Sequence, residues 1–211
     1  MKEILLNDNW LFHKENEVEG CVTLPHTYNA VDGQSGISMW RGKGFYKKEV
    51  LFSEEDLKEK IFLEIGASAM KSTVYMNGKT ICHNTCPYAM YRIALNEHII
   101  VGKNLLEIVT DNTATDEVYP QMADFSFYGG VYRDVKLVFV PQQLHFDYLD
   151  GSRDGVQVRT QKLDGQKWEV TVTGCVINEG KDCEGEVKVS VLDRQGVVFE
   201  KTLSMYFSEK Q

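Results

Sequence analysis

The chain has 211 residues, 43% of them hydrophobic and 26% charged, which is the balance of a soluble globular protein with one large or two modest domains. Its formal net charge of −8 argues against a nucleic-acid partner, because no basic stripe is available to displace counterions. No stretch is apolar for long enough to span a bilayer, and no secretory signal is visible at the start. We therefore expect a cytoplasmic protein without a membrane partner, unless a leader precedes this sequence.

The five cysteines are odd in number and show no framework spacing. Cys82-His83 and Cys86 suggest zinc at first sight, but no second ligand pair stands at zinc-finger spacing. We expect reduced, structural thiols.

The first two thirds of the chain alternate apolar and polar residues with a period of two, which predicts strands. The predicted strands span residues 44–52, 61–65, 72–76, 79–83, 104–110 and 131–140. Asn77-Gly78 predicts a tight hairpin, since both positions tolerate positive φ in a type I′ turn. Ser53–Lys60 is the helical candidate, with Ser53 as a cap, and its length predicts a single surface turn.

Pro141 ends this first block, and a second series of short strands separated by turns follows, as expected for a second sandwich. These strands are predicted at residues 144–149, 156–159, 168–177, 187–192 and 197–205. An immunoglobulin-like domain needs about 100 residues and about seven strands, more than Gln142–Gln211 supplies. We expect a truncated sandwich whose open edges associate through Trp168–Met205, either with another copy or with the first domain.

The segment Ala123–Phe139, ADFSFYGGVYRDVKLVF, is the most informative in the chain. An aromatic loop with one carboxylate, Asp124, runs through Gly129-Gly130 into an alternating strand. Such a loop suits a surface that stacks on flat ligands and offers a charged acceptor to hydroxyl groups.

Five pieces in order resemble the N-terminal region of glycoside hydrolase family 2, the β-galactosidase and β-glucuronidase family. They are WLF with VTLPHTYNAVDGQSG, GFYKKEV, IGASAMKSTVYMNGK, GKNLLEIVTDN and DFSFYGGVYRDV. The resemblance implies an all-β protein: a jelly-roll sugar-binding domain over Met1–Pro141, followed by the start of an immunoglobulin-like β-sandwich over Gln142–Gln211.

The resemblance also implies a retaining glycosidase of β-galactosidase type as the parent protein, with a β-glycoside as its substrate. Retaining chemistry needs two carboxyl groups about 5–5.5 Å apart, which the family mounts on a (β/α)₈ barrel of about 250 residues. Nothing here could build that barrel, so we expect the chain alone to be inactive. Asn96-Glu97 and Asn178-Glu179 superficially match the family's acid/base pair, but both sit in connections and are expected to be ordinary turn residues.

By the same resemblance, Asp124 falls where family members place an aspartate that reaches the sugar. There it contacts hydroxyl groups directly or through a bound cation, for which sodium and magnesium are the candidates. The alternative is a loop aspartate that caps nearby backbone amides.

Three further residues are candidates for sugar contacts. Phe127 and Tyr128 could stack on sugar rings, or could instead meet the absent barrel together with Phe125. Ser68 sits near a polar sugar-contacting position of some relatives, and a structural role is its alternative. For His26, a structural hydrogen bond in its loop is expected.

Three functional hypotheses follow. The chain is the non-catalytic front part of a family 2 glycosidase, a free-standing carbohydrate-binding module, or a structural sandwich pair that supports a neighbouring domain.

Overall fold

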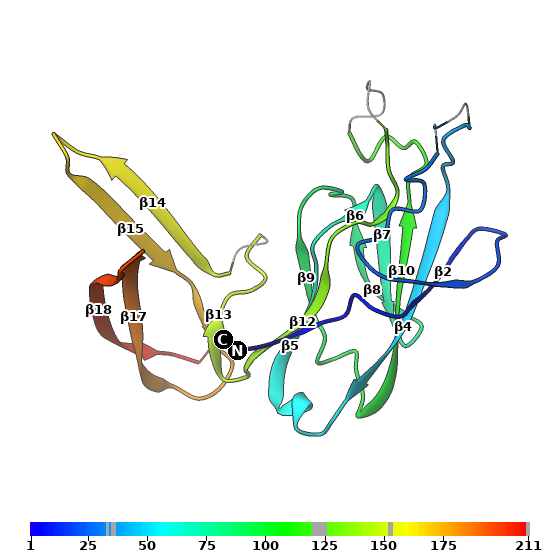
Figure 1. Ribbon diagram of the computed structural model, residues 1–211. Helices are drawn as coiled ribbons and strands as arrows, with labels where there is room; N and C mark the ends of the chain where they lie inside the picture. Colours follow the sequence, from blue (N-terminus) through cyan, green and yellow to red (C-terminus); the bar gives the residue numbers. More distant parts are fainter. Residues whose placement is uncertain (33, 35–36, 120–125, 152–153, 210–211) are drawn as a thin grey trace. The chain divides into compact units, whose positions relative to one another are not determined.

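The computed structural model describes residues 1–32, 34, 37–119, 126–151 and 154–209. These residues form strands and a short 3₁₀ turn and contain no α-helix, which confirms the all-β fold class. The chain divides into two compact units (Figure 1). The first comprises Met1–Val140 and the stretch that begins at Tyr148, and the second comprises Pro141–Asp147 and most of the remaining C-terminal residues. No helix of the described residues is long and apolar enough to cross a membrane.

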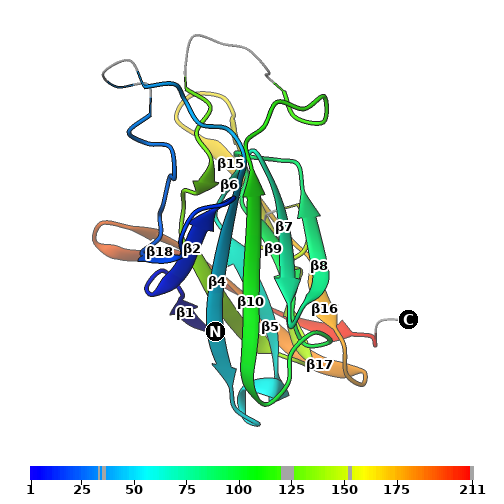
Figure 2. The same ribbon diagram turned by 90° about the vertical axis from the view of Figure 1, so that its right-hand side faces the viewer.

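The first unit is a β-sandwich of a four-stranded and a six-stranded sheet. The four-stranded sheet has the order β1 (Lys2–Leu5), β12 (Val135–Pro141), β5 (Glu59–Ile65) and β9 (Tyr91–Ala94). The six-stranded sheet has the order β3 (Gly20–Val22), β2 (Trp10–Lys14), β4 (Lys43–Phe52), β10 (Gly102–Asp111), β7 (Lys71–Met76) and β8 (Lys79–Asn84). All pairings in the larger sheet are antiparallel, and Figure 2 shows β4, β10, β7 and β8 side by side.

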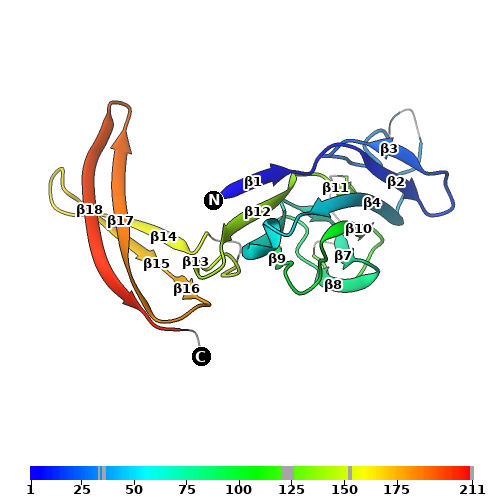
Figure 3. The ribbon, with the colours of Figure 1, turned by 90° about the horizontal axis from the view of Figure 1, so that it is seen from below.

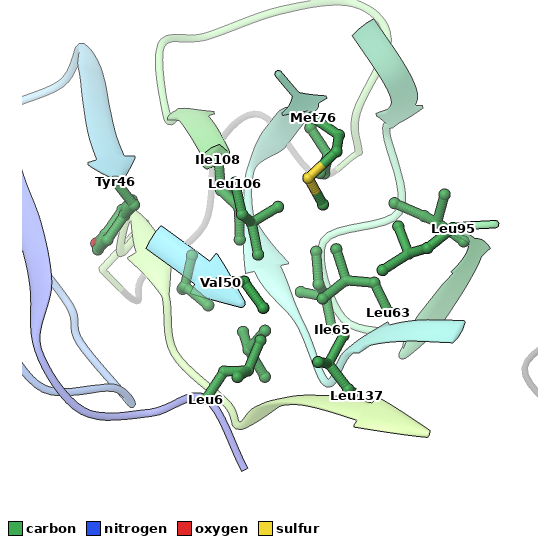
Figure 4. Packing of buried hydrophobic residues seen from close by; sticks show 14 of the residues in the cluster. Leu6, Tyr46, Val50, Leu63, Ile65, Met76, Leu95, Leu106, Ile108 and Leu137 are labelled. Carbon is green, nitrogen blue, oxygen red and sulfur yellow. The ribbon is translucent and has the colours of Figure 1, made fainter. Parts of the chain in front are cut away.

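The core of the first unit lies between these two sheets. Tyr46 and Val50 of β4 point inward while Lys47 and Glu49 point outward, as the alternation predicts. Figure 4 shows Val50, Leu106 and Ile108 from the larger sheet meeting Leu63, Ile65 and Leu137 from the smaller one. This apolar core holds the frame on which the loops at the strand ends are mounted.

Two local predictions are confirmed. Asn77 and Gly78 have φ of 52° and 75° and join β7 to β8 in a two-residue hairpin. The helical candidate is a single 3₁₀ turn over Asp56–Lys58, and the Ser53 hydroxyl accepts a hydrogen bond from the Asp56 amide.

The strand predicted over residues 131–140 is wrong in one respect, because it breaks into β11 (Gly130–Val131) and β12 with a bend between them. β11 pairs with β6 (Ser68–Ala69) and does not continue the pairing of β12 in the four-stranded sheet. In the bend, the Asp134 side chain accepts a hydrogen bond from Asn7 at 2.8 Å. The guanidinium of the neighbouring Arg133 donates to the backbone carbonyls of Gly66 and Tyr88.

The four-stranded sheet carries a buried ion pair on its outer side. Arg92 donates to Glu64 at 2.5 Å, and their side chains are only 5% and 11% exposed. Lys136 is 3.1 Å from the same carboxylate. Tyr148 covers this pair, since its ring lies 4.9 Å from the guanidinium and stacks on Phe62. The predicted strand 144–149 therefore ends early, at Phe146.

The described residues of the second unit form three two-stranded pairs, and Figure 3 shows the long hairpin β17–β18. The pairs are β13 (Leu144–Phe146) with β16 (Val176–Asn178), β14 (Val156–Lys162) with β15 (Trp168–Gly174), and β17 (Cys183–Asp193) with β18 (Gly196–Phe207). A hollow of about 690 Å³ lies between the two longer hairpins, lined mainly by apolar side chains. Trp168 is 60% exposed. The immunoglobulin-like assignment and the association through this half stay predictions.

Candidate functional site

The loop that ends in Phe127–Gly129 is held by two asparagines that are fully buried. The Asn29 amide donates to the carbonyls of Trp40 and Phe127, both at 3.2 Å, and its oxygen accepts the Gly129 amide at 2.9 Å. Asn29 and Gly129 are 100 residues apart in the sequence. One side chain therefore fixes two loops against each other.

Asn112, just beyond the end of β10, repeats this arrangement from the other side. Its amide donates to Phe127 and Trp40 carbonyls at 3.1 and 3.4 Å, and its oxygen accepts the Gly42 amide at 2.8 Å. Each of the two carbonyls thus has two donors. We call Asn29 and Asn112 the asparagine clamp.

Gly129 and Gly130 let this part of the chain pass close to the segment that contains His26 and Tyr28. A Cβ on Gly129 would lie 2.0 Å from the Tyr28 hydroxyl oxygen. Gly130 has φ of +125°, and a Cβ there would lie 2.4 Å from the His26 carbonyl oxygen. Backbone hydrogen bonds from Tyr28 to Gly129 and from His26 to Val131 complete the contact. The Gly129-Gly130 pair is therefore required by packing.

A pocket of about 510 Å³ lies beside the anchored loop. Its aromatic lining comes from Tyr88, Phe127, Tyr128 and Tyr132, which are contributed by separate segments of the chain. Arg133 adds a guanidinium, held by hydrogen bonds to the carbonyls of Gly66 and Tyr88 at 3.4 and 3.2 Å. Aromatic faces with a planar cation suit a flat, partly polar ligand such as a sugar ring. We call this the loop pocket.

The family model for the sugar-binding domain of family 2 glycosyl hydrolases matches residues 3–141. The chain belongs to this family. It is 30% identical over 202 residues to a β-glucuronidase of Bacteroides fragilis, covering 93% of the chain and 29% of that protein.

Among solved structures, a β-glucuronidase of Bacteroides uniformis superposes with a TM-score of 0.88 at 22% identity, covering the whole chain and 26% of the neighbour. A Parabacteroides merdae β-glucuronidase superposes with a TM-score of 0.81 at 22% identity, covering 99% of the chain and 31% of the neighbour. These two neighbours support the fold. The chain thus spans roughly a quarter to a third of each of these family 2 proteins.

The two aromatic residues predicted to contact sugar both line the loop pocket, but they differ in exposure. Tyr128 is 46% exposed and offers its ring to a ligand. Phe127 is 6% exposed and packs with Ala69, Met70 and Val118, while the Arg41 guanidinium lies 4.8 Å from its ring centre. Within the pocket, Tyr128 is therefore the more accessible of the two.

Ser68 is fully buried, on β6. Its hydroxyl forms a closed cluster with Ser72 at 2.7 Å and Tyr91 at 3.0 Å. Burial raises the pKa of Tyr91 to about 12, so all three hydroxyls are neutral at physiological pH. The structure gives Ser68 a packing role and places it away from the pocket surface.

Asp124 and Phe125 lie outside the described residues. The cation considered for Asp124 therefore stays a prediction. Elsewhere in the described part of the chain, no group of three His, Cys, Asp or Glu side chains could hold a metal ion. All five cysteines are free thiols.

His26 and the two Asn-Glu pairs have structural contacts. The His26 ring bonds to the Tyr46 hydroxyl at 2.8 Å, and burial, with a smaller contribution from Lys14, lowers its pKa. Asn96 accepts the Ile61 amide and donates to a carbonyl of β5. Asn178 bonds to three backbone groups around its own turn and β18.

The sequence did not point to the asparagine clamp or to Tyr88 and Tyr132 as pocket residues. A single asparagine in a turn is common, and the buried bonds of Asn29 to a segment about 100 residues away leave no local pattern. The bend between β11 and β12, which sets the position of Tyr132, was masked by the continuous alternation of residues 131–140.

Proposed function

We propose that this chain is the sugar-binding front part of a retaining family 2 glycosidase, and that its loop pocket completes a sugar site whose catalytic carboxylates lie on a barrel in the parent protein. The asparagine clamp supports this proposal most strongly. Its two buried side chains hold the segment Phe127–Gly129 by three hydrogen bonds and the segment Trp40–Gly42 by three more. A loop fixed to a rigid sandwich is well suited to present a ligand contact.

We propose β-glucuronides rather than β-galactosides as the substrate class. The relative that is 30% identical to this chain is named a β-glucuronidase, and so are the two structural neighbours described above. None of these three proteins is named a β-galactosidase, the specificity expected from the resemblance. The guanidinium of Arg133 at the pocket is compatible with an acidic sugar, because it presents a planar pair of donors to a carboxylate.

In the proposed site, Asp124 accepts hydrogen bonds from sugar hydroxyls, and Tyr128 packs its exposed ring against the sugar or its leaving group. A carboxylate suits hydroxyl donors because charge-assisted hydrogen bonds are stronger than neutral ones. The chain by itself carries no catalytic carboxylate pair in this proposal, so its contribution is positioning.

The role of Tyr128 can be tested in the longer protein that carries this chain joined to its barrel. Tyr128→Ala removes the ring, and we expect kcat/KM for an aryl β-D-glucuronide to fall roughly 2- to 10-fold, as the loss of one aromatic contact implies. Tyr128→Phe is the matched control, since it keeps the ring and should stay near wild type.

Equal activity of the alanine and phenylalanine variants and the wild type would contradict a role of Tyr128 in the site. It would leave the loop pocket as a contact surface for the neighbouring domain. The 211-residue chain alone, assayed with the same aryl glucuronide, should release product no faster than buffer. Enzyme-like turnover by the isolated chain would overturn the division of labour that we propose.

A further inference from the structure

A second hollow lies on the first unit, on the outward face of the six-stranded sheet, where β10, β7 and β8 run side by side (Figure 2). It has a volume of about 350 Å³. We call it the sheet groove, and its main lining residues are Lys43, Lys71, Thr73, Tyr75, His83 and Asp111. None of these residues lines the loop pocket.

The strand register explains why this face is hollowed. Thr73 of β7 is directly opposite Val109 of β10, and both have short side chains. Longer side chains stand around them: His83 is paired with Thr73 on one side, and Phe45 with Val109 on the other. Short residues between long ones on one face of a sheet leave a depression. The groove is therefore built into the sheet.

One wall of the groove is held in place by an ion pair. Lys71 is 3.0 Å from Glu117 and also contacts Thr115. The hydrogen bond to Glu117 raises the pKa of Lys71, and that to Lys71 lowers the pKa of Glu117, so both groups stay charged at neutral pH. This wall is polar and carries no net charge.

The remaining polar groups present both donors and acceptors. Among the described residues, no ion pair engages Lys43 and no hydrogen bond engages the Tyr75 hydroxyl. The described hydrogen bonds of Asp111 use Oδ1, which leaves Oδ2 for another donor. His83 bonds to Thr73 through Nδ1 at 3.1 Å, and its Nε2 remains.

We infer that the sheet groove is a second carbohydrate-binding site, which takes a neutral sugar unit of a glycan. Its donors and acceptors match the hydroxyl groups of a sugar, and the Tyr75 ring offers a face for stacking. Its charges balance, with two lysines against Asp111 and Glu117, so a neutral ligand fits better than an acidic one. A volume near the lower end for ligand sites fits one or two sugar rings.

The test uses the ¹⁵N-labelled 211-residue chain and records amide NMR spectra during titration with lactose, cellobiose and, separately, glucuronic acid. We expect saturable shifts with at least one neutral disaccharide at amides of β7, β8 and β10, and weaker shifts with glucuronic acid. Tyr75→Ala should weaken binding roughly 2- to 10-fold, as the loss of one aromatic contact implies.

Two further variants show whether binding occurs in the sheet groove. Val109→Phe leaves every polar group in place but fills the floor of the groove, and it should abolish the shifts. Leu11→Ala is the control, because Leu11 faces outward on the same sheet at 46% exposure and does not line the groove. Absence of saturable binding, shifts confined to the loop pocket, or preference for glucuronic acid would each overturn the inference. None of these outcomes bears on the activity of the Tyr128 variants, so the two proposals fail separately.

Discussion

The asparagine clamp makes a quantitative prediction that a double-mutant cycle can test. In Asn29→Ala, the buried Gly129 amide loses its acceptor, while the carbonyls of Phe127 and Trp40 keep Asn112 as their donor. In Asn112→Ala, only the Gly42 amide is stranded, for the same reason. A buried donor without a partner destabilises by about 1–3 kcal/mol, and this is the loss of unfolding free energy that we expect from each single variant.

The double variant also removes both clamp donors from each of the two carbonyls. The Phe127 carbonyl then loses two buried hydrogen bonds, which adds about 1–3 kcal/mol, and the loss at the partly buried Trp40 carbonyl adds less. The loss in the double variant should therefore exceed the sum of the single losses by about 1–3 kcal/mol. This excess is the signature of shared acceptors.

The free energies of unfolding for the cycle are measured by urea denaturation, with tryptophan fluorescence as the signal. The chain has two units, so a single transition should not be assumed. A Trp168→Phe background removes the tryptophan of the second unit and leaves Trp10 and Trp40 as reporters of the first. If the losses add to within about 0.5 kcal/mol, the two side chains act independently and the shared arrangement is refuted.

Three further predictions concern the same unit. Gly129→Ala should destabilise the first unit by about 1–3 kcal/mol, or prevent folding, because the new Cβ meets the Tyr28 hydroxyl. Gly20→Ala is the control, since Gly20 has open space around it, and should change the urea midpoint little. Equal urea midpoints for the two variants would refute the close approach of Gly129 to Tyr28. Glu64→Gln removes the carboxylate charge from the buried ion pair with Arg92. The free energy of unfolding measured in urea should therefore drop by about 3–5 kcal/mol, and a drop below about 1 kcal/mol would contradict the burial of this pair. The folded state lowers the pKa of His26 from 6.5, so the unfolded chain binds more protons than the folded chain just below that pH. The free energy of unfolding should therefore decline as pH falls below about 6.5, and His26→Gln should flatten that part of its pH profile. An unchanged slope in this variant would contradict the prediction.

The strands of the first unit could be predicted because local patterns encode them. The alternation in β4 follows from one buried and one solvated face, and Asn77-Gly78 encodes its hairpin through positive φ. β1 and β3 were missed, because strands of four and three residues carry too little alternation to stand out.

The candidate site could be predicted only in part. The aromatic loop with its two glycines predicted a site in this region, and Tyr128 lines a pocket there, while its contact with sugar stays a prediction. The burial of Ser68 could not be foreseen, because the local sequence of a serine two residues after a glycine is the same whether its hydroxyl faces solvent or two other hydroxyls. The clamp depends on contacts between distant segments, which no window of sequence contains.

The shape of the outer face of the larger sheet also depends on contacts between distant segments. Lys43, Lys47 and Glu107 follow from alternation as solvated residues. Whether such a face is flat or hollowed depends on which side chains stand opposite one another, and register follows from the turns and the pairing of distant strands. The sheet groove therefore became visible only when Thr73 and Val109 were placed side by side.

The most direct test of the central claim is the effect of Asp124→Asn on kcat/KM for an aryl β-D-glucuronide in the longer protein, with Asp164→Asn in the second unit as the matched control. A lost charge-assisted hydrogen bond of about 1.5–3 kcal/mol predicts a decrease of roughly 10- to 150-fold for Asp124→Asn and none for the control. Unchanged turnover in Asp124→Asn would contradict a sugar-contacting role for this loop and leave the chain as a scaffold.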